Sequence, residues 1–405
     1  MRKMYYGWWI VFACFFIISY TSGAVIMNFT AFFEPLSQEF GWSYTAISVA
    51  ASIRGLEQGI FAPVMGFLVD RLGSKKLLFS GVFTIGLGLL LLSMTNSLAA
   101  FYGATVVLSL GFSACAWPVI VPTVANWFKK DMGKALGIIS SGVGIGGLLV
   151  PVTVLFIDRF QWRVTFVILG LGMWLFGIPL ICIIRQNPEK LGLHIDGKSP
   201  DPLTASEADR DIDFKLKDAI RTRVFWHISL ADAIRLTAMT ALITHVIPYL
   251  NSVGMSRSKA ALVATLTPVL SIVGRLAFGW LGDTFSKINV LALAYTLGGI
   301  SFLSFAYVQQ MTWLIIPFLI LFPLSWGAAP LRDASMREYF GRVSLGSILG
   351  IMAGIGTAAR ISGPFLAGWT FDSFGDYRLV WLFFAASLAV CVILMLSLRP
   401  DRKKA

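Results

Sequence analysis

Two stretches of this chain repeat one pattern: Gly66-Phe-Leu-Val-Asp70-Arg71-Leu-Gly73-Ser-Lys75-Lys76 and Gly279-Trp-Leu-Gly282-Asp283-Thr-Phe-Ser-Lys287. Each one closes a long apolar segment with glycine, an acid and then base. The two acids, Asp70 and Asp283, are 213 positions apart (283 − 70), which is slightly more than half of the 405 residues. An offset of this size predicts a duplicated membrane unit, an arrangement found in many transporters.

The composition points to a protein that uses the bilayer as solvent. Hydrophobic residues make up 57% of the chain and charged residues only 13%, far from the balance of a soluble domain. The net charge of +12 does not indicate a nucleic-acid partner, because the basic residues lie mainly in short loops between apolar segments. The four cysteines lie within apolar runs without metal-type spacing, so we expect neither disulfides nor a metal site.

Apolar runs of about 20 residues, enough to cross ~30 Å of hydrocarbon as a helix, recur along the chain. They predict an all-α integral membrane fold with twelve transmembrane helices in two pseudo-symmetric six-helix bundles. The expected spans lie near 8–33, 44–69, 77–95, 100–127, 135–157, 163–184, 224–250, 259–282, 288–308, 312–331, 345–370 and 378–398.

A polar stretch separates the sixth span from the seventh. We expect an N-terminal bundle at 1–184, a cytoplasmic linker at 185–223 and a C-terminal bundle at 224–405. The end of the linker, Phe214–Ile220, has apolar residues at helical spacing between charged ones, which predicts a short amphipathic helix on the membrane surface. Basic residues gather in the loops on one side of the membrane, so both termini are expected in the cytoplasm.

Ionisable residues at membrane depth are costly and mark functional positions by default. Arg54 with Glu57 and Asp232 with Arg235 are each three residues apart, so each pair can meet on one helix face. Each pair is either a self-neutralising structural contact or a functional site. Glu57 and Asp232 are the proton-coupling candidates, because no other acid lies deep in the membrane.

Arg275 and Arg360 have no acid on the same helix, so they call for an anion. Arginine suits a carboxylate because its planar fork binds both oxygens and stays charged. Alternatively, Arg275 contacts Asp283 or backbone carbonyls at the end of its helix. Asn28 and Tyr20 offer hydrogen bonds from the first span.

These features resemble the major facilitator superfamily, whose motif between helices two and three is similar to residues 66–76. Within it, the chain resembles the monocarboxylate transporters and the bacterial oxalate/formate antiporters. The motifs that carry this likeness include Tyr6-Gly7-Trp8-Trp9, Phe32-Phe33-Glu-Pro35-Leu-Ser, Asn126-Trp127-Phe128-Lys-Lys, Trp162-Arg163, Gly363-Pro364 and Gly375-Asp376-Tyr377.

The resemblance implies roles for particular residues. Arg275 matches the helix-eight arginine that holds the substrate carboxylate, and Trp117 and Trp326 fall on spans that line the pathway. Asp70 is expected to pair with bases when the cytoplasmic side is shut. The implied gating residues are Asp70, Arg71, Asp283, Arg332 and Asp333.

The chain also departs from the family pattern. Ser271 stands where eukaryotic members have an aspartate, Met27 where they have a lysine, and Gly356 where the bacterial antiporters have a lysine. The coupling scheme of those relatives therefore cannot be copied over.

The function that follows is secondary active transport of small organic anions, foremost monocarboxylates resembling lactate and pyruvate, by alternating access with proton symport. Alternatives are exchange of dicarboxylates or of oxalate- and formate-like anions, and export of larger amphipathic solutes. We expect no catalytic residues, no cofactor and no metal. The expected partners are the anion, protons and the lipid of the cell (inner) membrane, with the monomer as the working form.

Overall fold

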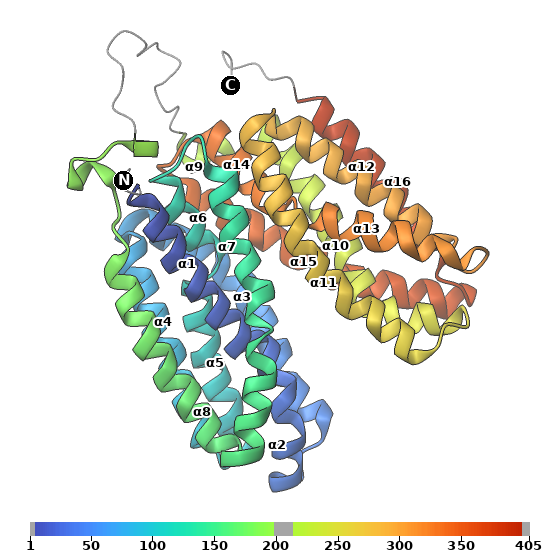
Figure 1. Ribbon diagram of the computed structural model, residues 1–405, viewed down its shortest axis with the longest axis horizontal. Helices are drawn as coiled ribbons and strands as arrows, with labels where there is room; N and C mark the ends of the chain where they lie inside the picture. The colour runs from blue at the N-terminus through green and yellow to red at the C-terminus, as the bar shows by residue number, and fades with distance from the viewer. Residues whose placement is uncertain (1–4, 198–213, 399–405) are drawn as a thin grey trace. The chain divides into compact units, whose positions relative to one another are not determined.

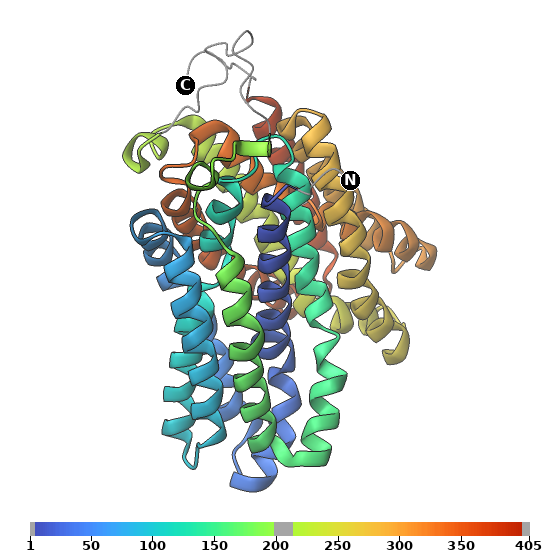
Figure 2. The same ribbon diagram turned by 60° about the vertical axis from the view of Figure 1, so that its left-hand side comes forward.

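The structure is a computed structural model that describes residues 5–197 and 214–398. All regular secondary structure within these two ranges is helical (Figures 1 and 2). The acidic part of the predicted linker, residues 198–213, lies outside the described residues.

Ten helical stretches in the described part of the chain are long and apolar enough to cross a membrane. One of them, Met132–Ile183, is 52 residues long and is interrupted at Gln161, whose φ is 67°, so it supplies two crossings. Helix α3 (Tyr44–Leu72) adds a more polar stretch of 29 residues. These segments correspond to the twelve predicted spans and confirm the fold class.

The chain forms two compact units. The first comprises Met1–Lys129, Ile138–Asp213 and Gly341–Gly354. Its elements, with α7 reaching it only beyond Gly137, are α1 (Gly7–Thr21), the π-helix η1 (Ser22–Met27), the 3₁₀ helix η2 (Asn28–Phe32), α2 (Phe33–Phe40), α3, α4 (Ser74–Ser93), α5 (Leu98–Ala114), α6 (Trp117–Ala125), α7 (Met132–Gly146), α8 (Leu149–Ile183), η3 (Pro188–Leu191) and η4 (Ile195–Gly197).

Glycines bring the helices of the first unit close together. Helices α1, α4, α5 and α8 run side by side in both views (Figures 1 and 2). A Cβ added at Gly88 of α4 would lie 2.6 Å from Cα of Leu108, and one at Gly146 of α7 would lie 2.6 Å from the carbonyl oxygen of Ser19. Small residues at such crossings allow the backbones to approach, as is usual between transmembrane helices.

The second unit comprises Lys130–Gly137, Phe214–Phe340 and Ile355–Ala405. The start of α7 and the later part of α15 belong to it. Its other elements are α9 (Leu216–Ala219), α10 (Arg223–Ser252), α11 (Arg257–Thr284), α12 (Lys287–Ala306), η6 (Thr312–Leu314), α13 (Ile315–Trp326), α14 (Ala329–Phe340), α15 (Leu345–Phe374) and α16 (Arg378–Leu396).

Aromatic rings fill the interior of the second unit. Tyr249, Phe305 and Trp381 are each almost fully buried, and the Phe305 ring stacks on Phe318 with 4.2 Å between centroids. Ring pairs of this kind add to the stabilisation from burial alone. They join α10, α12, α13 and α16 into one packed body.

The two units differ from the predicted division at two short segments. Lys130–Gly137 belongs to the second unit and Gly341–Gly354 to the first. The start of α7 therefore lies outside the unit that contains most of 1–184, and the start of α15 lies outside the unit that contains most of 224–405. Within the segment Phe214–Ile220 the structure has the four-residue helix α9, with Lys215 and Lys217 exposed and Ala219 buried. An amphipathic helix on the membrane surface stays a prediction.

Candidate functional site

The two repeated acids bind the amino ends of two helices. In the first unit, the carboxylate of Asp70 accepts hydrogen bonds from the backbone N–H groups of Gly346 (3.1 Å) and Ser347 (2.8 Å) and from the Ser347 hydroxyl (2.6 Å). In the second unit, Asp283 accepts from the N–H groups of Gly133 and Lys134, both at 2.7 Å. The first N–H groups of a helix lack intrahelical partners and attract negative charge.

The partners of these acids obey the same repeat as the acids. Gly346 and Ser347 follow Gly133 and Lys134 by 213 positions, as Asp283 follows Asp70. The contacts depend on glycine, since a Cβ at Gly133 would lie 2.5 Å from the carbonyl oxygen of Gly279. The equivalent Cβ at Gly346 would lie 2.6 Å from the carbonyl oxygen of Gly66.

The carboxylate of Asp70 thus binds a helix amino end and a hydroxyl. Its pairing with bases when the cytoplasmic side is shut stays a prediction. Arg71 is exposed and places its guanidinium 4.1 Å from the centre of the Phe67 ring. The gating role of these residues stays a prediction.

The repeat also shows which part of Arg275 the fold requires. Its backbone carbonyl oxygen lies 2.7 Å from a Cβ placed on Gly137. The carbonyl oxygen of Ala62 likewise lies 2.7 Å from a Cβ placed on Gly350. Ala62 precedes Arg275 by 213 positions. Because alanine suffices at the equivalent crossing, the arginine side chain is an addition that this packing does not require.

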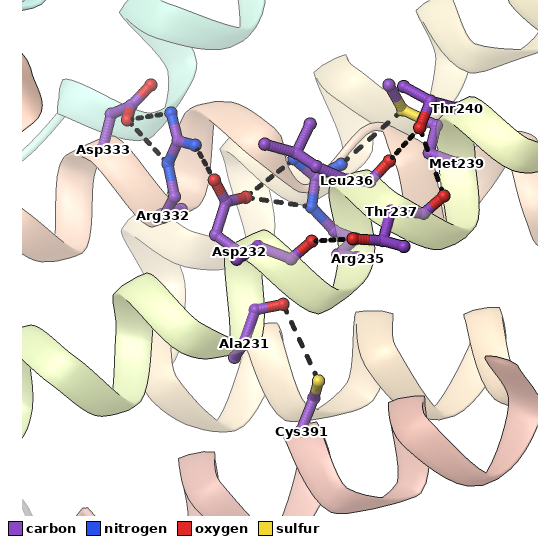
Figure 3. A network of polar contacts seen from close by, with 11 residues as sticks. Ala231, Asp232, Arg235, Leu236, Thr237, Met239, Thr240, Arg332, Asp333 and Cys391 are labelled. Carbon is purple, nitrogen blue, oxygen red and sulfur yellow. Dashed lines mark hydrogen bonds and ion pairs between the residues drawn. The ribbon is translucent and has the colours of Figure 1, made fainter. Parts of the chain in front are cut away.

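A buried ionic network lies in the second unit (Figure 3). Arg235 donates from Nε (3.1 Å) and Nη2 (2.8 Å) to Oδ1 of Asp232, which confirms the predicted pair. Arg332 donates to Oδ2 of the same Asp232 and, from Nε, to Asp333 at 2.8 Å. Asp232 and Asp333 are 2% and 3% exposed. Two acids and two bases balance each other in charge.

This network gives Arg332 and Asp333 partners that the sequence did not predict. Arg332 joins Asp333 to the Asp232–Arg235 pair, and Asp333 is buried. Buried charges are held in this way because an unpaired ion inside a protein is costly. The gating role of these two residues stays a prediction.

Trp326 connects this network with Arg275. The guanidinium of Arg275 lies 6.0 Å from the centre of the Trp326 ring, at the outer limit of a cation–π contact. Trp326, Ser325 and Arg235 line one small cavity with Phe302, Phe322 and Met239. Trp326 therefore lies beside Arg275 and also lines a cavity with Arg235. A guanidinium can bind a carboxylate, and an indole ring can pack its organic part.

Arg360, in the part of α15 that belongs to the second unit, is an exposed cation. Within residues 5–197 and 214–398 it has neither a hydrogen bond nor an ion pair. It is close enough to Asp232, Arg235 and Arg332 to interact with their charges.

The candidate residues of the first unit lie on or near an irregular part of the first span. Tyr20 donates to the Leu169 carbonyl (2.7 Å), and Asn28 donates to the Thr153 hydroxyl (2.6 Å). These donors are used inside the unit, which favours structural roles for Tyr20 and Asn28. Trp117 is half-buried at the first position of α6.

The predicted Arg54–Glu57 pair is absent from the described part of the chain. Arg54 donates from Nη1 to the carbonyl of Val25 in η1, and its guanidinium lies 5.2 Å from the centre of the Phe29 ring in η2. Oε2 of Glu57 is buried without a hydrogen-bond partner there. Spacing allowed the pair, but the carbonyl of the π-helix binds the arginine instead.

Comparison with known proteins decides the family. The sequence model of the Major Facilitator Superfamily matches residues 9–329 and 246–405. The chain belongs to the Major Facilitator Superfamily. It is thus a multi-pass membrane protein of a transporter family.

Named relatives of this superfamily member span almost its whole length. It is 28% identical to monocarboxylate transporter 12 of Xenopus laevis over 410 residues, covering 96% of this chain and 88% of that protein. It is 25% identical to monocarboxylate transporter 13 of Rattus norvegicus, with 92% and 84% covered. The MFS-type transporter YcxA of Bacillus subtilis is also 25% identical, with 95% and 92% covered.

Solved structures share the fold of this superfamily member. The human organic anion transporter MFSD10 superposes with a TM-score of 0.73 at 12% identity, covering 96% of this chain and 99% of that one. The Escherichia coli fucose:proton symporter FucP gives 0.69 at 18% identity, with 99% and 100% covered. At these identities the likeness concerns the fold alone.

Sequence reasoning missed three features of the site. Arg332 was not recognised as a member of the buried network, because Asp232 lies 100 positions away. Ser325 and the Val25 carbonyl were also missed. The cue for Ser325 was its place beside Trp326, whereas nothing in the sequence marks a carbonyl freed by a π-helix.

Proposed function

We propose that this protein is a secondary active transporter of small organic anions, foremost monocarboxylates such as lactate and pyruvate, working by alternating access with proton symport. The observation that carries the proposal is Arg275 beside Trp326 in the second unit. The relatives named monocarboxylate transporters support the substrate class.

Arg275 supplies the chemistry that such a substrate needs. A guanidinium can bind both carboxylate oxygens through parallel N–H donors and stays charged at any physiological pH. The Trp326 ring offers an apolar face for the short carbon chain of the solute. Since the repeat has Ala62 at the equivalent position, the packing at this helix crossing does not require the charge of Arg275.

Symport with a proton fits the energetics of anion uptake. Membrane potential opposes entry of a monovalent anion by about 2.3 kcal/mol per 100 mV. A proton that crosses together with the anion cancels this charge. We place the protein in the cell membrane with both termini in the cytoplasm, working as a monomer.

Anion exchange is the second candidate, and Arg360 favours it. Within the described residues, this cation is not held by an acid. A further cation near the network would suit a dicarboxylate or two exchanging anions. In that case transport would proceed without a pH gradient and would require an anion on both sides.

The test replaces Arg275 and measures uptake of labelled L-lactate and pyruvate into liposomes. Arg275→Gln should weaken apparent affinity about 10- to 100-fold, because a charge-assisted hydrogen bond contributes about 1.5–3 kcal/mol. Arg275→Lys should lie between, since it keeps the charge and loses the fork. Arg221→Gln, which removes an exposed arginine before α10, is the matched control. Wild-type affinity in Arg275→Gln would refute the proposal.

A further inference from the structure

Glu57 lies halfway along a transmembrane helix with one carboxylate oxygen unsatisfied. It is the fourteenth of the 29 residues of α3, so about 20 Å of helix lies on either side of it. Its Oε2 is buried and lacks a hydrogen-bond partner within the described residues. Ser109 of α5 is near enough to interact with the carboxylate, yet its Oγ is also buried without a partner there.

Few charges surround this carboxyl group. Elements that pack on α3 in the first unit are η1 and η2, which carry no ionisable side chain, and α2, α4, α5, α6 and the start of α15. Of these, α6 and residues 345–354 carry no ionisable side chain, and α5 carries only Tyr102, whose hydroxyl donates to the Ala46 carbonyl. The remaining charges are at the far ends of the helices, namely Glu34 and Glu39 on α2, Lys75 and Lys76 on α4, and Asp70 and Arg71 on α3 itself.

The closest base on the same helix is Arg54, and it is occupied elsewhere. Its Nη1 binds the Val25 carbonyl, and its guanidinium lies beside Phe29. An ionised carboxylate at membrane depth, with one oxygen buried without a hydrogen-bond partner and no base paired to it among the described residues, would cost several kcal/mol. A protonated carboxylic acid would not carry this cost. The arrangement is that of a neutral Glu57.

We infer that Glu57 is the proton-binding residue of the carrier and that Arg54 couples the protonation state of Glu57 to the conformation of η1 and η2 in the first span. This rests on the proposed function. When Glu57 holds a proton, Arg54 supports η1 and η2 through Val25 and Phe29. When the proton leaves to water, the carboxylate attracts Arg54, which lies three residues away and within reach through a change of rotamer.

The switch would act on backbone that is already irregular. In η1 and η2 the first span changes from α-helix to π-helix and then to 3₁₀ helix. π-helical segments are often found at functional sites. Departure of Arg54 from the Val25 carbonyl would leave a backbone acceptor without its donor, so the segment would rearrange. The proton and the monocarboxylate then cross together with no net charge moved.

The first experiment detects the proton itself and needs no substrate. Infrared difference spectra of the purified full chain, recorded across a pH series, show the carbonyl stretch of buried protonated carboxylic acids. We expect a band that is lost in Glu57→Gln and kept in Glu34→Gln, which removes an exposed glutamate of α2. In Arg54→Gln the band should persist to higher pH, because the ionised form has lost its base. An unchanged band in Glu57→Gln would overturn the assignment, and an unchanged titration in Arg54→Gln would overturn the switch.

The second experiment separates coupling from binding. In liposomes, Glu57→Gln should retain exchange of labelled L-lactate for internal L-lactate and lose accumulation driven by an inward proton gradient. Glu34→Gln should retain both. Gradient-driven accumulation by Glu57→Gln would overturn the proposal. If wild-type protein moves no monocarboxylate in either assay, the proposed function fails, and the infrared result still decides whether Glu57 holds a proton.

Discussion

Asp232 is the member of the buried network whose loss should cost most. Its carboxylate accepts from Arg235 through Oδ1 and from Arg332 through Oδ2, and it is 2% exposed. Asp232→Asn keeps the size of the side chain and removes its charge. Arg235 then loses its acid, while Arg332 keeps Asp333.

The expected cost follows from this asymmetry. Removing one partner of a buried ion pair leaves an uncompensated charge and typically costs about 3–5 kcal/mol. Asp333→Asn leaves both guanidinia bound to Asp232, so its cost should be closer to that of a charge-assisted hydrogen bond, about 1.5–3 kcal/mol. The double variant should cost more than the sum, because Arg332 keeps one acid in either single variant and none in the double variant.

The assay is equilibrium unfolding in mixed micelles, followed by tryptophan fluorescence, for the wild type, the two single variants and the double variant. The free energy of unfolding should fall in the order wild type, Asp333→Asn, Asp232→Asn. Equal stabilities of Asp232→Asn and the wild type would refute the network as a stabilising element. A larger loss in Asp333→Asn would refute the view that Asp232 is its centre.

Two other predictions concern the repeat and the end of the first unit that carries α2. Gly133→Ala and Gly346→Ala should each lower the thermal stability of the detergent-solubilised protein, because a Cβ at either site would lie within 2.6 Å of a carbonyl oxygen. Gly103→Ala is the control and should not lower it, because a Cβ there meets open space. Equal effects of all three variants would contradict the role of close packing. A hydrogen bond from Arg163 lowers the pKa of Glu39 below its ordinary value of 4.5. The stabilisation by this pair should therefore be present above pH 4.5 and lost as the pH falls through the lower folded-state pKa, and Glu39→Gln should remove this acid sensitivity from the unfolding curve.

Hydrophobic patterning was enough to predict the helices of this chain. An apolar run of about 20 residues that crosses a bilayer forms a helix, because its backbone N–H and C=O groups must bond to one another in the absence of water. The spans therefore follow from the position of these runs. The repeat at Asp70 and Asp283 was also visible. Its meaning was not, because their partners are backbone N–H groups up to 277 positions away.

The candidate site was predictable only in its components. The Asp232–Arg235 contact follows from i,i+3 spacing, and the structure has it. The same spacing misled at Arg54 and Glu57, because a π-helix in another span offers Arg54 a carbonyl. Local spacing shows which side chains can meet, and tertiary structure decides which of them do.

The central claim is that a monocarboxylate binds at Arg275. The most direct measurement is a thermal-shift titration of the wild type and Arg275→Gln with mono- and dicarboxylates at several pH values. We expect L-lactate or pyruvate to stabilise the wild type, and we expect this stabilisation to be lost in Arg275→Gln and retained in Arg221→Gln. Stabilisation of Arg275→Gln equal to that of the wild type, or no response of the wild type to any monocarboxylate, would contradict this claim.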